Sequence, residues 1–112
     1  MATSAEFIEF VCDQISGTGD IRSKKMFGEY MVYVNAKPVL LVCDDMVFVK
    51  ILPELENIMA DAERGFPYDG AKEHYILDID NSDFSREVVD ILKLVIPLPK
   101  PKKKKIRNGD EI

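Results

Sequence analysis

The chain has 112 residues, of which 46% are hydrophobic, and a formal net charge of -5. This length fits one domain whose core needs neither metals nor disulfides. The sequence holds no apolar run of about 18 residues and no basic, apolar N-terminal leader, which argues against a membrane span and a signal peptide and predicts a cytoplasmic protein.

The first predicted element is an amphipathic helix. Thr3 and Glu6 are spaced as a capping box at its start, and apolar residues follow at intervals of three and four. Gly17 and Gly19 end the helix after about three turns. Its apolar face requires a sheet to pack against.

Two short strands are predicted next, over residues 21–27 and 29–34, because both stretches are rich in strand-forming residues. Gly28 between them can take the backbone conformation of a bulge or a tight turn. We expect Met26 and Phe27 to pack against the first helix. Together with Gly28 they form a structural motif.

The following residues predict the rest of an antiparallel meander. Asn35 opens a hairpin turn over residues 35–37, and the nearly continuous apolar run 38–43 predicts a central strand. A second turn at residues 44–45 leads into a returning strand over residues 46–50.

The second half of the chain predicts helix, strand and helix. Pro53 suits the first turn of a helix, and a long loop with glycines and a proline follows over residues 64–72. Residues 75–79 predict a strand, and Ser82 caps a last amphipathic helix that Pro97 stops. We therefore expect an α+β fold of two layers, an antiparallel β-meander packed against helices in the order helix, three to four strands, helix, strand, helix.

The domain is expected to span residues 1–96, and a disordered tail rich in proline and lysine is expected over residues 97–112. The first part holds 9 Lys and Arg against 18 Asp and Glu, whereas the tail holds 6 against 2. An acidic body is a poor candidate for groove-filling nucleic-acid binding. The tail is either a weak, salt-sensitive contact for phosphate or anionic lipid or a solubilising segment. Its charge is concentrated in Lys102, Lys103, Lys104 and Lys105.

The residues that carry catalysis or bind metals form no recognisable pattern. Cys12 and Cys43 are too few for a disulfide framework and are predicted to be reduced and mostly buried, and His74 alone cannot assemble a zinc site. Asp78 and Asp80 could hold a divalent cation, but solvated acidic surface is the favoured interpretation. No nucleotide-binding or hydrolase motif occurs, so we predict no enzyme, no cofactor and no metal.

Two groups of residues are candidates for an interaction surface. Lys24 and Lys25 beside Met26, Phe27, Tyr30 and Tyr33 could form a basic, aromatic patch that pairs with phosphates and stacks bases. The favoured interpretation is that the lysines protect an edge strand against mispairing while alternate residues point into the core. Phe66 and Tyr68, in the long loop, form the second group.

The run of residues 24–30, a basic pair followed by Met-Phe-Gly-Glu-Tyr, resembles the N-terminal domain of the TfoX/Sxy family of bacterial competence regulators. The apolar strand 39–43, the Phe-Val-Lys strand 48–50 and the Phe-Pro-Tyr run 66–68 keep the family's order, so the resemblance spans about residues 5–96. It implies an α+β domain and a co-activator of competence genes that acts alongside the cAMP receptor protein. Family members that regulate competence usually carry a second, helical domain, where this chain has a basic tail.

Three functional hypotheses follow. The leading one is a non-enzymatic regulatory domain that contacts proteins, by resemblance those of transcription, through its sheet edge or the loop 64–72. The alternative is a weak nucleic-acid-binding protein that uses the tail together with Lys24 and Lys25. The least favoured is a small-ligand carrier or enzyme with a pocket beside Phe66 and Tyr68, next to Tyr75.

Overall fold

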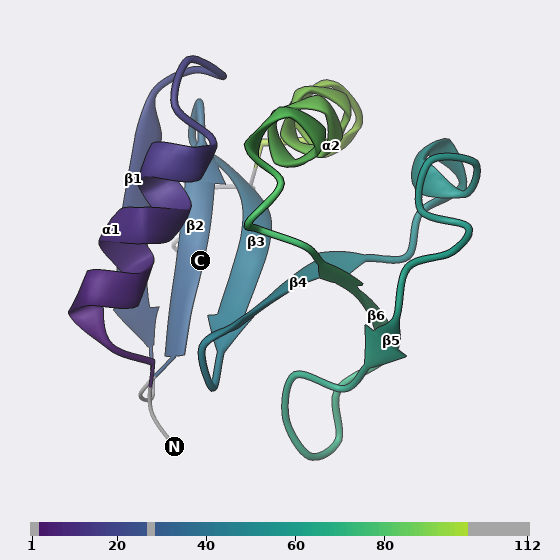
Figure 1. Cartoon of the computed structure of the whole chain (residues 1–112), viewed down its shortest axis with the longest axis horizontal. Helices are drawn as coiled ribbons and strands as arrows, with labels where there is room; N and C mark the ends of the chain where they lie inside the picture. The colour runs from purple at the N-terminus through teal and green to yellow at the C-terminus, as the bar shows by residue number, and fades with distance from the viewer. Residues whose placement is uncertain (1–2, 27–28, 99–112) are drawn as a thin grey trace, which may run out of the picture.

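Helices and strands are arranged in two layers in the computed structural model, which describes residues 3–26 and 29–98 (Figure 1). Within these residues one antiparallel sheet has six strands in the order β1-β2-β3-β4-β6-β5. α1 crosses over β1 and β2, and α2 packs on β3. The elements in chain order are α1 Ala5–Gln14, β1 Ile21–Met26, β2 Glu29–Val34, β3 Lys37–Cys43, β4 Met46–Lys50, the 3-10 turn η1 Pro53–Leu55, β5 Arg64–Gly65, β6 His74–Leu77 and α2 Ser82–Val95. The predicted α+β class and the meander of β1 to β4 are confirmed.

Two tight turns build the meander. Asn35 and Ala36 connect β2 to β3 with φ of 53° and 68°, and Asp44 and Asp45 connect β3 to β4 with φ of 54° and 56°. Such pairs of left-handed residues give the turn a twist that matches the twist of the strands. The first turn is one residue shorter than predicted, because Lys37 already pairs with Val34.

A β-bulge accommodates the proline of the central strand. Tyr33 pairs with Pro38 and Val32 pairs with Leu40, so Val39 is an extra residue on β3. Proline has no N–H to donate to the ladder, and a bulge is one of the places where a sheet tolerates it. The bulge also brings both Val39 and Leu40 into the core.

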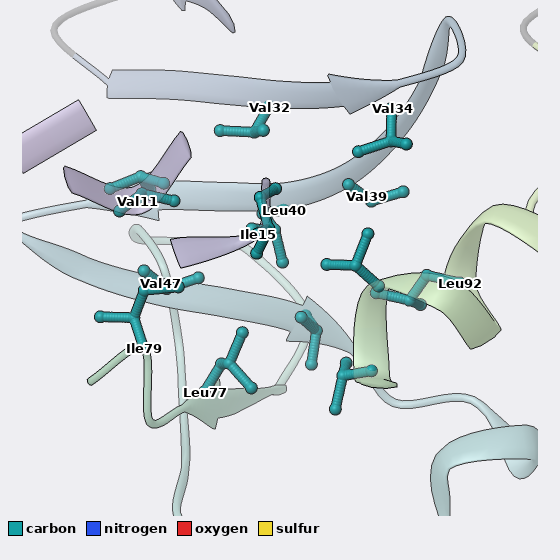
Figure 2. Packing of buried hydrophobic residues seen from close by; sticks show 14 of the residues in the cluster. Val11, Ile15, Val32, Val34, Val39, Leu40, Val47, Leu77, Ile79 and Leu92 are labelled. Carbon is teal, nitrogen blue, oxygen red and sulfur yellow. The ribbon is translucent and has the colours of Figure 1, made fainter. Parts of the chain in front are cut away.

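The core lies between the two helices and one face of the sheet (Figure 2). Successive side chains of a strand point to opposite faces, so alternate residues of each strand enter the core. Both helices contribute to the same cluster, which shows that they cover the same face of the sheet. Among its buried members are Val11, Ile15, Val32, Leu40, Val47, Leu77 and Leu92.

The helix predicted after Pro53 is not a regular α-helix. One 3-10 turn, Pro53–Leu55, is followed by hydrogen-bonded turns as far as residue 61. Asn and Asp are poor helix formers, and this segment contains one of each. Leu55 and Met59 are nevertheless fully buried, so the predicted apolar stripe does reach the core.

The loop predicted over residues 64–72 begins with a strand. Arg64–Gly65 pairs with β6, and the amide of Ile76 donates to the carbonyl of Glu63 at 2.8 Å. A two-residue strand is too short to show any alternation in the sequence. The next strand, β6, starts at His74 and ends at Leu77, two residues earlier than predicted.

Each helix is capped by the residue next to the one predicted as its cap. Ser4 caps α1, since its Oγ accepts from the amide of Phe7 at 3.1 Å. Asn81 caps α2, and Ser82 instead donates its hydroxyl to the carbonyl of Gln14 at 2.7 Å. The side-chain amide of Gln14 donates to the carbonyl of Ile79 at 2.8 Å, so these two bonds join the end of α1 to the start of α2.

Thr3, the predicted cap of α1, binds the sheet instead. Its hydroxyl donates to the carbonyl of Val42 at 3.5 Å and accepts from the amide of Asp45 at 3.3 Å. The side chain is buried. Thr3, which the sequence pattern predicts as a helix cap, therefore links the N-terminal segment to the β3–β4 turn.

The loop between α1 and β1 contains a glycine that larger residues cannot replace. Gly19 has φ of 153°, and an added Cβ would lie 2.7 Å from Oδ1 of Asn35 and 2.9 Å from Cγ1 of Val34. The same Oδ1 accepts from the amide of Asp20 at 2.9 Å, which ties the loop to the first hairpin.

We expect Gly19→Ala to lower the free energy of unfolding by about 2 kcal/mol, because it combines backbone strain with the loss of the Asn35 contact. Gly17→Ala is the matched control, since Gly17 also has positive φ but faces open space. It should cost about 1 kcal/mol. Urea denaturation of both variants measures the difference, and equal losses would show that the contact with Asn35 contributes nothing.

Two sequence predictions lie outside the described residues. Phe27 and Gly28 of the predicted structural motif are one, and the tail from residue 99, with its four consecutive lysines, is the other. Met26, the remaining member of the motif, is half-buried at the end of β1, where it pairs with Glu29 and points away from the helices, as Lys24 does two residues earlier. The prediction that Met26 packs against the first helix is therefore wrong.

Candidate interaction surfaces

The predicted basic pair lies on an edge strand. Lys24 and Lys25 are both exposed on β1, the first strand of the sheet. Lys24 pairs with Met31 and Lys25 with Tyr30, so the two side chains point to opposite faces of the sheet. In the described part of the chain neither lysine forms an ion pair. An edge position agrees with the interpretation that they protect the strand against mispairing.

Tyr30 faces the helices. It is half-buried and packs against the core, on the same face as Val32 two residues later. Of the two lysines, only Lys25 lies on its side of the sheet. Tyr30 and the two lysines therefore do not form one stacking platform.

The second group of predicted residues lies at the far edge. Phe66 and Tyr68 follow β5 and are 64% and 52% exposed. Because β1 and β5 are the two edge strands of a six-stranded sheet, about 24 Å separates them at 4.8 Å per strand. Tyr75 beneath the loop is buried, with the guanidinium of Arg64 5.3 Å from its ring centroid. The hollow beside Tyr75 is lined by neither Phe66 nor Tyr68.

An apolar row crosses the face of the sheet that is turned away from both described helices. Met31 pairs with Leu41, Leu41 with Phe48, and Phe48 with Ile76. Each is a neighbour in sequence of a core residue and so points the other way. We call these four residues, together with Tyr33, the outer face. A hollow of about 90 Å³ lies in its middle, lined by Met31, Pro38, Val39, Leu40, Leu41, Phe48, Lys50 and His74.

Charge is distributed unequally between the two sides of the molecule. By alternation along β1, Arg22 and Lys24 border the outer face, and Lys50 lines its hollow. Glu29 is the acidic residue of the described strands that points to this side. The exposed residues of the helices are mainly acidic, with Glu6, Glu9 and Asp13 on α1 and Asp83, Glu87 and Asp90 on α2. On α2, Arg86 pairs with Asp83 and Lys93 pairs with Asp90.

A histidine closes one end of the hollow. His74 pairs with Lys50, and its ring stands edge-on to Phe48 at 6.4 Å between centroids. Its Nδ1 lies 2.7 Å from the carbonyl of Lys72, which fixes the orientation of the ring. Phe48 is only 4% exposed, so it fills the floor of the hollow and offers no ring for stacking.

A larger groove has an acidic rim. It measures about 620 Å³ and lies between the turns after η1, β6 and the start of α2. Asp61, Glu63 and Asp78 line it together with the apolar Ile58 and Phe84. Asp78 lies within the predicted strand 75–79 and Asp80 directly after it, but both follow the end of β6 at Leu77. Across the described residues no three His, Cys, Asp or Glu side chains are grouped as a metal ion requires.

Both cysteines are free thiols that favour the protonated form. Burial, followed by the nearby carboxylate of Glu29, its hydrogen bond to the thiol and the charge of Asp44, raises the pKa of Cys43 to about 12. Burial and then Asp13 raise the pKa of Cys12. Thiolates are the nucleophilic form of cysteine, so neither residue is activated for catalysis.

In the part of the chain that the structure describes, no helix has the length and hydropathy to cross a bilayer.

The outer face is the feature that sequence reasoning missed. Alternation in β2 and β4 indicates that Met31 and Phe48 point away from neighbouring core residues, but it does not show which residues lie beside them. That requires the register between strands, which depends on the turns and on the bulge at Val39. The signal in the sequence was the high apolar content of both faces of residues 38–43, which exceeds what a half-solvated strand requires.

Comparison with known proteins agrees with the fold. Over residues 13–82 the chain matches the family described as the TfoX N-terminal domain, a range that includes all six strands. A protein of Spirochaeta aurantia, described as an uncharacterized 12.7 kDa protein in the trpE 5'region, is 32% identical over 109 residues, which make up 96% of this chain and 95% of that protein. The resemblance carried by residues 24–30 is thereby confirmed, and the chain belongs to the TfoX N-terminal domain family.

Proposed function

We propose that the chain is a non-enzymatic regulatory domain that acts through protein contacts, with partners among the proteins of transcription and a role of the kind that competence regulators have. The outer face carries this proposal. Its apolar row is continuous across four strands and consists of half-buried side chains around the buried Phe48, and contiguous apolar surface on a folded domain marks sites of interaction. Family membership supports a regulatory role, and the raised pKa of both thiols argues against catalysis by cysteine.

Site-specific photo-cross-linking tests the proposal in cells. A photoreactive amino acid replaces Tyr33 on the outer face, Phe66 on the far loop, or Glu9 on the acidic side of α1 as the control. We expect cross-links to a specific transcription-related protein from Tyr33, and none from Glu9. The absence of a specific cross-link at both Tyr33 and Phe66 would contradict the proposal.

Weak nucleic-acid binding is the second candidate function. One observation favours it: Lys24 and Lys25 are exposed, and no described residue forms an ion pair with either. The lysines of the tail would add a non-specific attraction to phosphates.

A salt titration measures this second function. If it holds, the logarithm of the association constant for duplex DNA falls linearly with the logarithm of the salt concentration, since each phosphate contact releases counterions. Deleting residues 97–112 should reduce the slope by about 3 to 5, because the deletion removes six basic residues. An unchanged slope would show that the tail makes no contact with the phosphates of the DNA.

A further inference from the structure

We propose that the outer face binds an amphipathic helix of a protein partner, with acidic residues on both flanks of its apolar stripe. The inference rests on the proposed function and names the surface and the chemistry of the partner. It draws on the shape of the face, the charges at its border and the conformation of its aromatic residues.

The dimensions of the face suit a helix. Four cross-strand neighbours, from Met31 on β2 to Ile76 on β6, span about 14 Å at 4.8 Å per strand. A helix rises 1.5 Å per residue, so about nine residues lie along this row and present side chains at i, i+3 or i+4, and i+7. The shallow hollow over Phe48 receives the middle one.

The residue types of the face suit an adaptable apolar contact. Met31, Leu41 and Ile76 are half-buried, so each still exposes apolar surface around the floor formed by Phe48. Methionine is unbranched and fills irregular gaps, which is why it is common on surfaces that bind helices. The apolar stripe of the partner therefore needs leucine-like residues rather than a single large anchor.

The charges at the border select an acidic helix. Lys24 and Lys50 border the outer face and form no ion pair with the described residues, whereas Arg22 borders it while paired with Asp20 at 3.3 Å. Glu29 is the acidic residue of the described strands that points to this side. Glu29 is also hydrogen-bonded to the thiol of Cys43, which occupies part of its accepting capacity. The helices on the other side are acidic and repel an acidic partner. Complementary charge on one face and repulsion on the other give orientation and specificity.

Two other occupants fit less well. Single-stranded nucleic acid needs exposed rings for stacking, but Phe48 is buried and stands edge-on to His74, and Tyr33, the other aromatic residue of the outer face, is half-buried. Among the described residues, each helix of a second copy exposes one large apolar side chain, Phe10 on α1 and Leu94 on α2. One such side chain cannot fill a row of four apolar residues. Such a contact would also be head-to-tail and would not close into a dimer.

Fluorescence anisotropy with a synthetic peptide tests the inference. The probe is a labelled 18-residue amphipathic helix with leucines on one face and glutamates on the other, and the control probe has lysines in place of the glutamates. The full chain should bind the glutamate peptide with saturation and bind the lysine peptide at least about tenfold more weakly.

Neighbouring lysines supply the matched pair of protein variants. Lys24→Glu reverses a charge at the border of the outer face, whereas Lys25→Glu reverses one on the opposite side of the same exposed strand. Lys24→Glu should weaken binding of the glutamate peptide about fivefold, and Lys25→Glu should leave it unchanged. Met31→Ala should weaken it about tenfold, with thermal melting to confirm that the variant folds.

Several outcomes overturn the inference. These are no saturable binding of the glutamate peptide, equal binding of both peptides, or equal effects of the two lysine variants. Competition by a single-stranded oligonucleotide would assign the face to nucleic acid, and self-association that Lys24→Glu abolishes would assign it to a second copy. If photo-cross-linking finds a protein partner but the glutamate peptide does not bind, the inference of an acidic helix is wrong and the proposed function stands. If cross-linking finds none, the proposed function fails on its own test.

Discussion

Replacing Leu92 with alanine should lower the free energy of unfolding by about 3 kcal/mol. Leu92 lies in the last turn of α2 with no exposed surface. It belongs to the cluster that joins α2 to the β3 residues Val39 and Leu40 (Figure 2). Truncation removes the burial of three carbon atoms and leaves a cavity that the rigid strands cannot close.

The same helix provides the control for this prediction. Leu94 follows two residues later and is 79% exposed, so Leu94→Ala should change the free energy of unfolding by less than about 0.5 kcal/mol. Both substitutions have the same effect on helix propensity, so their difference isolates the packing of Leu92. Urea denaturation followed by circular dichroism measures both. Equal losses would show that α2 is not anchored to the sheet at Leu92.

The periodicity of apolar residues predicts the burial of Leu92 and the exposure of Leu94, and it also predicts the fold. The apolar residues of α2 recur at helical spacing, and Val32 and Val34 alternate with more exposed neighbours along β2. Such local repeats suffice to place the two helices, the four strands of the meander and their buried faces. These repeats depend only on the geometry of a single helix or strand, so the local sequence is enough to reveal them.

Contacts between distant segments explain what the sequence did not predict. Thr3 has the spacing of a cap but bonds to Val42, 39 residues away, so the helix begins at Ser4 instead. Arg64–Gly65 becomes a strand only because β6 offers a free edge. In both cases a tertiary partner decides between two local conformations of similar free energy.

The candidate surface depends on tertiary structure even more strongly. Lys24 and Lys25 look equivalent in the sequence, yet the register with β2 assigns them to opposite faces. Phe66 and Tyr68 are exposed as expected, but the strand order puts them at the edge far from both lysines. No property of single residues reveals the row formed by Met31, Leu41, Phe48 and Ile76, because it contains one residue from each of four strands.

Cys43 should react with iodoacetamide about a thousandfold more slowly than an unstructured cysteine at pH 7.5. Its pKa is raised from 9.0 to about 12, so the fraction of thiolate falls by about three orders of magnitude. Alkylation of the folded protein followed by peptide mass spectrometry gives the rate at Cys43 and, separately, at Cys12. A rate at Cys43 close to that of the urea-unfolded chain would contradict the prediction.

Glu29→Gln separates the two main causes of this shift. Burial is the larger cause and remains in the variant, whereas the charge of Glu29 is removed. The alkylation rate at Cys43 should therefore rise but stay below that of the unfolded chain. The rate at Cys12, whose pKa is raised by burial and Asp13, should stay the same and serves as the internal control.

The raised pKa also determines how stability depends on alkaline pH. Between pH 9 and about 12 the folded chain keeps the Cys43 proton that the unfolded chain has released. The unfolded state thus binds fewer protons, so the stability contributed by the protonated thiol is complete below pH 9 and is lost progressively up to about pH 12. Cys43→Ala should lose less stability than the parent chain over this interval, in urea denaturation at a series of pH values.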